Sequence, residues 1–245
     1  METLQVWGQP LADPEHERLR IGLAALSEEL RSGALQPSST TAETGNAAFL
    51  GDLREALRPM PKAMWPRLAT SVNEDQVESK LWLLEQLGRV DLSQHRIVIL
   101  GAWYGLLAMM MDRLLARPPA ETCCVDIDPG TCELAREVLS ILSSPPDVIC
   151  ADMLAMDYAE LSAGRPTIFI NTSCEHLANF AGWRDQVPTG AHLVLQSNNH
   201  LGCLEHVNCV PDIDAFERQA RLSHVTFRGS LPLRRFTRFM LIGRA

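Results

Sequence analysis

The 245-residue chain lacks several features that would assign it to a common class of protein. No apolar run approaches the roughly 20 residues that span a bilayer, and the start shows no signal-peptide pattern. Basic residues are not in excess, since the net charge is -8 and the sequence pI is near 5.4. This balance argues against a protein that grips nucleic-acid phosphates. We therefore expect a cytoplasmic protein that binds neither membrane nor nucleic acid.

The seven cysteines also lack the paired spacing that is typical of metal-binding motifs. They are scattered along the chain, which is typical of reduced thiols. Cys203 and Cys209 flank His206, but no second CxxC-type pair completes a metal site there. The sequence therefore predicts no metal.

The three-glycine fingerprint of dinucleotide-binding folds is the third absence. Only Gly101 and Gly105 follow the apolar run 97–100, and the bulky Trp103 and Tyr104 lie between them. A pyrophosphate would have little room there, so NAD and FAD are disfavoured. An adenosyl ligand without phosphates fits better.

What the chain does contain is half of a nucleotide-binding site. Residues 97–100 form a short apolar run that is typical of a buried parallel strand. The glycine turn follows, and then an expected helix at 106–115 whose N-terminal amides would face a ligand. The next apolar run ends at Asp126, where dinucleotide folds place the acid that accepts hydrogen bonds from ribose. An ordinary strand, turn and helix without a ligand is the alternative.

The alternation of strand and helix continues to the end of the chain. Further strands are expected at 147–150, 167–170 and 192–196, helices at 131–142 and 212–221, and a closing antiparallel hairpin at 225–229 and 238–242. The apolar runs end in polar residues, which is where an open α/β sheet keeps its ligand site.

This order of motifs resembles the class I S-adenosylmethionine-dependent methyltransferase superfamily over residues 90–245. The resemblance implies an α/β, Rossmann-like fold: a mostly parallel seven-stranded sheet with an antiparallel C-terminal hairpin. It also implies S-adenosylmethionine as the cofactor. The implied binding residues are Gly101, Trp103, Tyr104 and Gly105 under the methionine part, Asp126 at the ribose, Ile127 directly after it, Asp152 with Met153 at the adenine edge, and Asn171 after strand four. One departure is that Ile99 and Leu100 stand where many members carry an acid.

The first 90 residues are expected to form a helical cap or lid, and residues 91–245 the S-adenosylmethionine-binding domain. A helix is predicted at 14–31 and a link at 36–45. Ser71-Val-Asn-Glu74 reads as a capping box that opens a helix to about Leu87. Lys80 on this helix could meet a carboxylate, such as that of the cofactor, and a solvated lysine is an equal alternative.

Two polar segments, 171–176 and 197–208, supply the candidate catalytic residues. These are Asn171, Glu175, His176, Ser197 and Asn199. Asn171 can hold a donor amine, and Glu175 or His176 can accept a proton or steer an ammonium. The alternative for Glu175 and His176 is an N-terminal cap of a helix from Leu177. A cluster of arginines at 234, 235 and 238 is expected to lie on a solvated hairpin.

The reaction stays open, because a sulfonium can be attacked at any of three carbons. The chain is also similar to the azetidine-2-carboxylate synthases in size, helical cap and the 171–176 segment. That resemblance implies cyclisation of S-adenosylmethionine with release of methylthioadenosine. Trp103, Tyr104, Phe180 and Trp183 would stabilise the sulfonium by cation-π contact.

The alternative reaction is methyl transfer to a nitrogen or oxygen of a small metabolite, which releases S-adenosylhomocysteine and requires mainly alignment of the nucleophile. A third hypothesis is a non-catalytic, adenosyl-binding partner protein. A small-molecule substrate from natural-product metabolism is expected, and a homodimer is left open.

Overall fold

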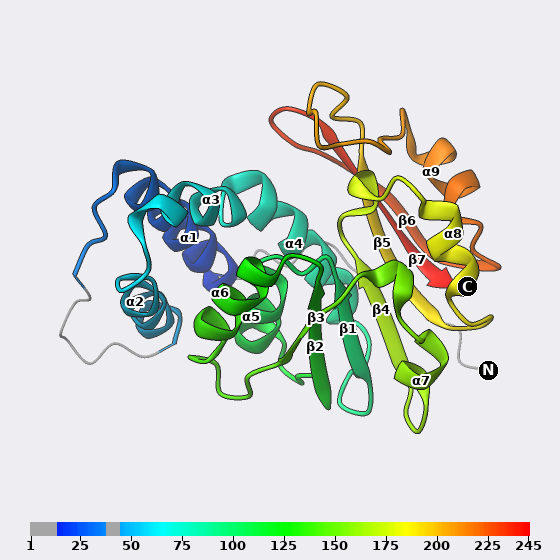
Figure 1. The fold of residues 1–245 in the computed structure, drawn as a ribbon, viewed down its shortest axis with the longest axis horizontal. Coiled ribbons are helices and arrows are strands. Elements are labelled where there is room, and N and C mark those ends of the chain that lie inside the picture. The colour runs from blue at the N-terminus through cyan, green and yellow to red at the C-terminus, as the bar shows by residue number, and fades with distance from the viewer. Residues whose placement is uncertain (1–13, 38–44) are drawn as a thin grey trace.

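The computed structural model describes residues 14–37 and 45–245, so most of the predicted link at 36–45 lies outside the described residues. Its centre is a seven-stranded sheet with the order β3-β2-β1-β4-β5-β7-β6 (Figure 1). All neighbouring strands are parallel except β7, which runs antiparallel to both β5 and β6. The predicted Rossmann-like fold with a C-terminal hairpin is confirmed.

The strands begin and end close to their expected positions. They are β1 (Arg96–Leu100), β2 (Glu121–Asp126), β3 (Asp147–Cys150), β4 (Thr167–Asn171), β5 (His192–Asn198), β6 (His224–Pro232) and β7 (Thr237–Arg244). Leu100 at the end of β1 pairs with Val125 on β2 and with Asn171 on β4. The carboxyl ends of the three strands are therefore level, and the loops that follow them meet at one edge of the sheet.

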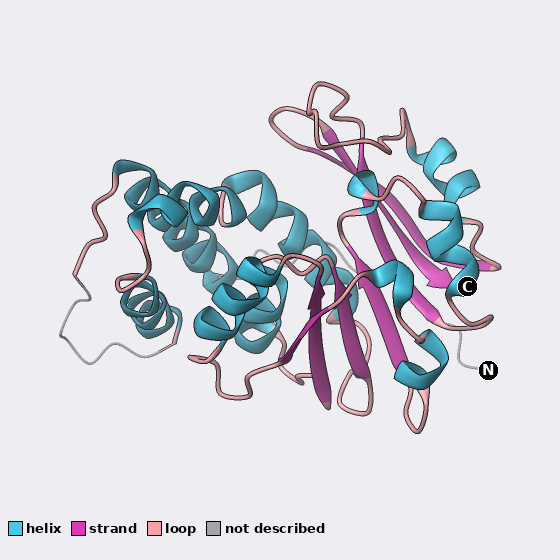
Figure 2. Ribbon diagram, viewed as in Figure 1, coloured by secondary structure: helices cyan, strands magenta, loops and turns pink. Residues whose placement is uncertain are grey.

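Helices cover both faces of the sheet, as Figure 2 shows by colour. They are α1 (Pro14–Ser32), α2 (Asn46–Leu57), η1 (Lys62–Met64), α3 (Trp65–Ser71), α4 (Glu74–Leu87), α5 (Leu106–Leu114), α6 (Pro129–Leu139), η2 (Met153–Ala155), α7 (Tyr158–Ser162), η3 (Cys174–His176), α8 (Phe180–Gln186) and α9 (Ile213–Ala220). Helices α4, α5 and α6 lie on one side of the sheet, and α7, α8 and α9 on the other (Figure 1).

Alternation along each strand divides the core between these two faces. Ile97 and Ile99 of β1 belong to the hydrophobic cluster under α5 and α6. Val98 and Leu100 belong to the cluster under α7, α8 and α9. Side chains on a strand point alternately to its two faces, so a strand covered on both sides must be apolar throughout.

The N-terminal helices share the first of these two cores. Leu23 of α1, Leu53 of α2 and Leu83 of α4 lie in the same continuous cluster as Met110 of α5 and Ile99 of the sheet. The side-chain amide of Gln196 on β5 also donates to the carbonyl of Ser79 at 3.0 Å, which fixes α4 against the sheet. No helix among the described residues is both long and apolar enough to cross a membrane.

Two local predictions were wrong. Helix α4 is capped by Asn73, whose side chain accepts from the Gln76 amide at 2.9 Å, whereas Ser71 ends α3 and donates to the carbonyl of Leu68. A cap by Glu175 or His176 for a helix from Leu177 does not form either. Both residues lie in η3, and α8 starts later with Asn179 as its cap.

Candidate functional site

A cavity of about 680 Å³ opens where the carboxyl ends of β1 to β4 meet α3 and α4. Its size lies within the range of roughly 300–1,000 Å³ that is usual for small-molecule sites. The predicted site residues that line it are Lys80, Gly101, Trp103, Tyr104, Asp126, Ile127, Asp152, Met153, Glu175 and His176. The two sides of the cavity differ in how they are built.

The first side is the turn between β1 and α5, which places three residues in the left-handed conformation. Gly101, Trp103 and Gly105 have φ values of 64°, 53° and 79°. A Cβ on Gly105 would come within 2.6 Å of a Leu139 methyl, so glycine is also required there for α5 to pack closely on α6. Trp103 is not a glycine, and such a residue is strained in this conformation.

Asp126 at the end of β2 holds this turn in place. One carboxylate oxygen accepts from the backbone amide of Trp103 at 2.9 Å, and the other accepts from the amide of Asp128 at 3.2 Å. Each oxygen retains acceptor capacity, because a carboxylate offers about four lone-pair positions. The side chain lines the cavity and can still accept hydrogen bonds from a ligand.

The cavity continues along the loop after β3. Asp152 caps the short helix η2 by accepting from the amide of Leu154 at 2.8 Å. Met153 lies next to it on the cavity wall, and Ile127 from the loop after β2 leaves 65% of its surface exposed. An apolar side chain exposed at a cavity mouth is a suitable contact for a flat ring.

The opposite side carries three charged groups taken almost entirely out of water. Glu175 and Arg238 form an ion pair at 2.7 Å, with both side chains 3% exposed. The same Glu175 oxygen accepts from the side-chain amide of Asn198 at 2.6 Å. The second Glu175 oxygen and Nε of Arg238 have no hydrogen-bond partner within the described part of the chain. Both residues line the cavity, so these atoms are suited to a polar ligand.

Lys80 is the third of these charges. It projects from α4 and is 8% exposed, and its Nζ donates to the Gln76 side chain at 2.5 Å. Burial lowers the pKa of Lys80 to about 7, with the nearby Arg238 guanidinium acting in the same direction and Glu175 opposing both. Near neutral pH this lysine can therefore hold or release a proton. The prediction of a solvated lysine was wrong.

Other predicted residues lie outside the cavity lining. Gly105 starts α5 behind the turn. Asn171 is fully buried, and its side chain accepts from the amide of Ser173 at 2.9 Å and approaches the sulfur of Met153 at 3.6 Å. Ser197 is buried in the sheet, and Asn199 accepts from the amide of Thr237. None of these four residues lines the cavity, although Asn171 contacts the lining residue Met153.

Of the four aromatic residues that were expected to contact the sulfonium, two line the cavity and two do not. Trp103 and Tyr104 stack with ring centroids 5.3 Å apart, and both line the cavity. Trp183 lies in the core on the other face of the sheet, where its indole donates to the Tyr158 hydroxyl at 2.7 Å, and Phe180 packs beside it. Neither Phe180 nor Trp183 contributes to the cavity lining.

Arg238 is the main residue that the sequence analysis misplaced. It was expected on a solvated hairpin, but it is buried near the start of β7 beside Asn198 of β5. A signal was present, because an arginine starting the apolar run 238–242 must find a partner if the strand is central. Thr172, Ser173 and Glu205 also line the cavity and belong to the predicted polar segments 171–176 and 197–208, whereas the lining residues Arg67, Thr70 and Gln76 were not predicted as site residues.

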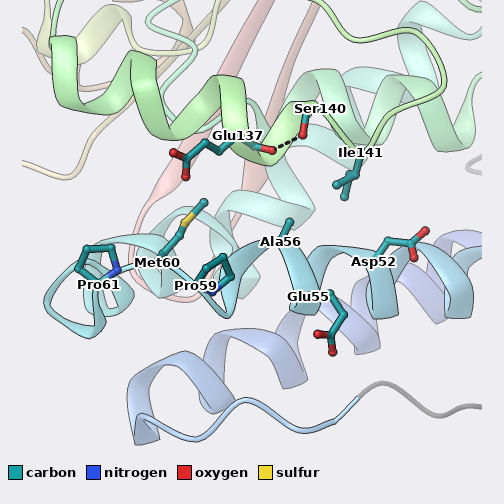
Figure 3. Close-up of a pocket in the computed structure, with 9 residues that line it drawn as sticks. All are labelled: Asp52, Glu55, Ala56, Pro59, Met60, Pro61, Glu137, Ser140 and Ile141. Carbon is teal, nitrogen blue, oxygen red and sulfur yellow. Dashed lines mark hydrogen bonds between the residues drawn. The ribbon is translucent and has the colours of Figure 1, made fainter.

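A second hollow, of about 760 Å³, lies between α2 and α6 (Figure 3). It is lined by Asp52, Glu55, Ala56, Pro59, Met60, Pro61, Glu137, Ser140 and Ile141. Helix α6 starts beside the carboxyl end of β2 and ends at Leu139, so this hollow lies at the far end of the helix from the site. Glu55 is already paired with Arg58 at 2.9 Å. We therefore place the candidate site in the cavity at the strand ends.

No protein-family model and no curated protein matches the chain. Solved structures do. A putative sarcosine dimethylglycine methyltransferase from Galdieria sulphuraria matches with a TM-score of 0.52 and 11% identity, over 71% of this chain and 87% of that one. The N-methyltransferase NodS from Bradyrhizobium japonicum WM9, in complex with S-adenosyl-L-homocysteine, matches with a TM-score of 0.51 and 14% identity, over 95% of this chain and 98% of that one.

A mutant of MtNAS matches with a TM-score of 0.50 and 14% identity, over 96% of this chain and 79% of that one. At these identities the likeness concerns the fold. The fold is that of the class I S-adenosylmethionine-dependent methyltransferases, as the order of motifs predicted.

Proposed function

We propose that this protein is an S-adenosylmethionine-dependent transferase that methylates a nitrogen or oxygen of a small molecule. The observation that carries the proposal is one cavity with two different ends. One end is the glycine turn held by Asp126, and the other is the buried set of Lys80, Glu175 and Arg238. The fold neighbour NodS, an N-methyltransferase in complex with S-adenosyl-L-homocysteine, agrees with this reading.

The residues present fit the cofactor. Gly101 leaves room at the turn, since a Cβ there would lie 3.3 Å from Ser173. Asp126 is suited to the ribose hydroxyls, and Asp152 with Met153 and Ile127 to the adenine. The Arg238 guanidinium, whose Nε has no hydrogen-bond partner among the described residues, suits the carboxylate of the amino-acid end. The amino-acid end would then be held through its carboxylate, since Ile99 and Leu100 stand where many members of the superfamily carry an acid.

When bound, S-adenosylmethionine would supply a methyl group attached to a sulfonium sulfur. Attack by a lone pair on the methyl carbon would break the carbon–sulfur bond and leave the sulfur as a neutral thioether. Trp103 and Tyr104 present stacked rings to the cavity, which suits a cation. Lys80 in its neutral form accepts the proton that an attacking amine loses. Glu175 and Arg238 offset each other's charge, so the wall near Lys80 stays close to neutral.

Cyclisation of S-adenosylmethionine to azetidine-2-carboxylic acid is the second candidate. The observation that favours it is the position of Lys80, because a base beside the proposed carboxylate site also lies beside the amine of the same amino acid. In that reaction the amine nitrogen bonds to the γ-carbon, the bond from that carbon to sulfur breaks, and the sulfur keeps its electron pair in methylthioadenosine. The amine proton passes to Lys80.

Incubation with S-adenosylmethionine, alone and with a panel of small amines and alcohols, separates these reactions by mass spectrometry. S-adenosylhomocysteine that forms only with an acceptor supports methyl transfer. Methylthioadenosine with azetidine-2-carboxylic acid from the cofactor alone supports cyclisation. If calorimetry shows that S-adenosylmethionine binds but neither product forms, the hypothesis of a non-catalytic adenosyl-binding protein is supported. If S-adenosylmethionine does not bind, the proposal is overturned.

A further inference from the structure

The loop between β5 and α9 carries four potential metal ligands at equal spacing. His200, Cys203, His206 and Cys209 follow one another at intervals of three residues, as His-x2-Cys-x2-His-x2-Cys. Two imidazoles and two thiols are the donor set that tetrahedral Zn²⁺ takes in many structural sites. The sequence analysis considered three of these residues and missed the regular spacing that His200 completes.

The backbone folds so that this spacing brings the side chains together. The amide of Cys203 donates to the carbonyl of His200 at 3.2 Å, and the amide of His206 donates to the carbonyl of Cys203 at 3.1 Å. Each hydrogen-bonded turn thus begins at one ligand and ends at the next. These two turns bring the first three ligands to the same side of the loop.

The donor atoms are already close. One donor atom from each of His200, Cys203 and His206 lies within 4.8 Å of the others. The sulfur of Cys209 is 3.7 Å from Nδ1 of His206. Bond lengths of about 2.1 Å to nitrogen and 2.3 Å to sulfur correspond to tetrahedral edges of about 3.3–3.8 Å. The set of donors within 4.8 Å of one another does not include Cys209, so its side chain must move toward the other three to complete the coordination.

The apolar side chains of this loop also point outward to solvent. The residues that follow the first three ligands are Leu201, Leu204 and Val207, and they are 75%, 99% and 62% exposed. A loop stabilised by hydrophobic burial would place these side chains inward and the polar ones outward. The observed arrangement is expected if the interior of the loop is held by metal ligation.

A competing set of donors shares His206, since Glu175 and His176 also lie within 4.8 Å of it. Glu175 already accepts from Arg238 and Asn198. A cation bound there would also meet the Arg238 guanidinium at short range. The electrostatics therefore favour the set within the loop.

We infer that residues 200–209 bind one Zn²⁺ ion through His200, Cys203, His206 and Cys209. Binding releases the thiol protons of the two cysteines to solvent. The site has a structural role, because the same loop forms part of the wall of the cavity. Glu205 lines the cavity, its carbonyl contacts Nδ1 of His176 at 3.1 Å, and the amide of Asn208 donates to the carbonyl of Glu175 at 2.8 Å.

The test uses the full chain, purified with a reducing agent, stripped with a chelator and titrated with Co²⁺ under nitrogen. We expect one equivalent to bind, with the near-ultraviolet thiolate charge-transfer band and the visible bands of tetrahedral Co²⁺. Added Zn²⁺ should displace the Co²⁺ and raise the melting temperature of the protein.

Variants locate the ion. Cys203→Ser and His206→Gln should each weaken Co²⁺ binding by more than about tenfold, a loss that even an outer-shell partner can cause. Cys150→Ser and His224→Gln are the matched controls, because both residues are exposed and distant in sequence from the loop, and both variants should bind as the wild type does. Circular dichroism of the metal-free proteins checks that each variant is folded.

The inference is overturned if the stripped protein binds no stoichiometric Co²⁺, if the spectrum lacks the thiolate band, or if Cys203→Ser binds as tightly as the wild type. Cys209→Ser should reduce the intensity of the thiolate band while Co²⁺ remains bound. An unchanged band in that variant would remove Cys209 from the ligand set.

Discussion

The two ends of the cavity are built from different parts of the sequence. The end at Asp126 comes from the loops after β1, β2 and β3, within about 55 residues of chain, and much of it is held by backbone hydrogen bonds. The other end joins Lys80 of α4, Glu175 of η3 and Arg238 of β7. A binding surface can thus be encoded locally, whereas a desolvated charge cluster requires elements that are far apart in the chain.

The two ends also differ in their energetics. Asp126 is only partly buried and accepts two backbone hydrogen bonds. Glu175 and Arg238 are buried and depend on each other, because removal of one leaves the other charged and unpaired. Substitutions at the Lys80 end should therefore alter folding as well as function, and those at the Asp126 end mainly ligand binding.

The largest effect is expected for Glu175→Ala, which leaves Arg238 buried without its counter-charge. Breaking such a pair costs about 3–5 kcal/mol of unfolding free energy. Chemical denaturation measures it. The control is Asp185→Ala, which breaks the exposed pair with Arg221 and should change stability very little. Equal losses in the two variants would contradict the difference in burial.

The pH dependence of stability should reveal Lys80. Its pKa is about 7 in the fold against an ordinary value of 10.5, so between these values the folded chain holds fewer protons than the unfolded one. The unfolding free energy then rises with pH across this window. Relative to Lys80→Met, the wild type should gain on the order of a few kcal/mol between pH 7 and 10.5.

Lys62→Met is the matched control, because Lys62 is the other lysine of the chain and is exposed. Lys80 is intact in this variant, so its unfolding free energy should still rise with pH across the same window. If Lys80 serves as the base, turnover should also rise with pH through about 7 and be lost in Lys80→Arg, which stays protonated.

Asp126→Ala should weaken the binding of S-adenosylmethionine by about 10- to 150-fold, which corresponds to the roughly 1.5–3 kcal/mol of hydrogen bonds to a charged group. Isothermal calorimetry measures this affinity. Asp214→Ala removes an exposed acid on α9 and should leave the affinity unchanged. Wild-type affinity in Asp126→Ala would remove this residue from the ligand site.

The smallest effect is expected for Asn171→Ala, which removes the acceptor for the Ser173 amide. A lost hydrogen bond of this kind costs about 1 kcal/mol of stability. Because Asn171 does not line the cavity, the affinity for S-adenosylmethionine should fall less than turnover does. Calorimetry and product formation, measured on the same preparation, compare the two.

The prediction from sequence succeeded where the pattern was local. The strand before Gly101 and the acid at the end of β2 lie within about 30 residues of each other, and apolar runs with polar ends are sufficient to identify them. The cap of α4 was misassigned because Ser71 and Asn73 are both good capping residues, and only the end of α3 decides between them. Local sequence rules alone could not decide which of these two residues caps α4.

The other end of the cavity could not be read in this way. Arg238 and Glu175 are 63 residues apart, and the apolar run that starts at Arg238 indicates burial only if the strand is known to be central. The hydrophobic pattern alone does not show that β7 lies inside the sheet beside β5, with β6 at the edge. Lys80 was identified as a candidate, but its low exposure depends on how α4 packs over the sheet.

The contacts that hold α4 against the sheet determine how a small molecule can enter the cavity. Hinge motion of the N-terminal helices would break the Gln196 to Ser79 hydrogen bond and expose the core that these helices share with the sheet. Each large aliphatic side chain returned to water costs about 1.5–3 kcal/mol, so a swing of many such residues is prohibitive. We therefore propose that helices α1 to α4 stay in place and form a fixed wall of the cavity when a small molecule enters. Hydrogen exchange in α4 should stay slow whether the cavity is empty or filled.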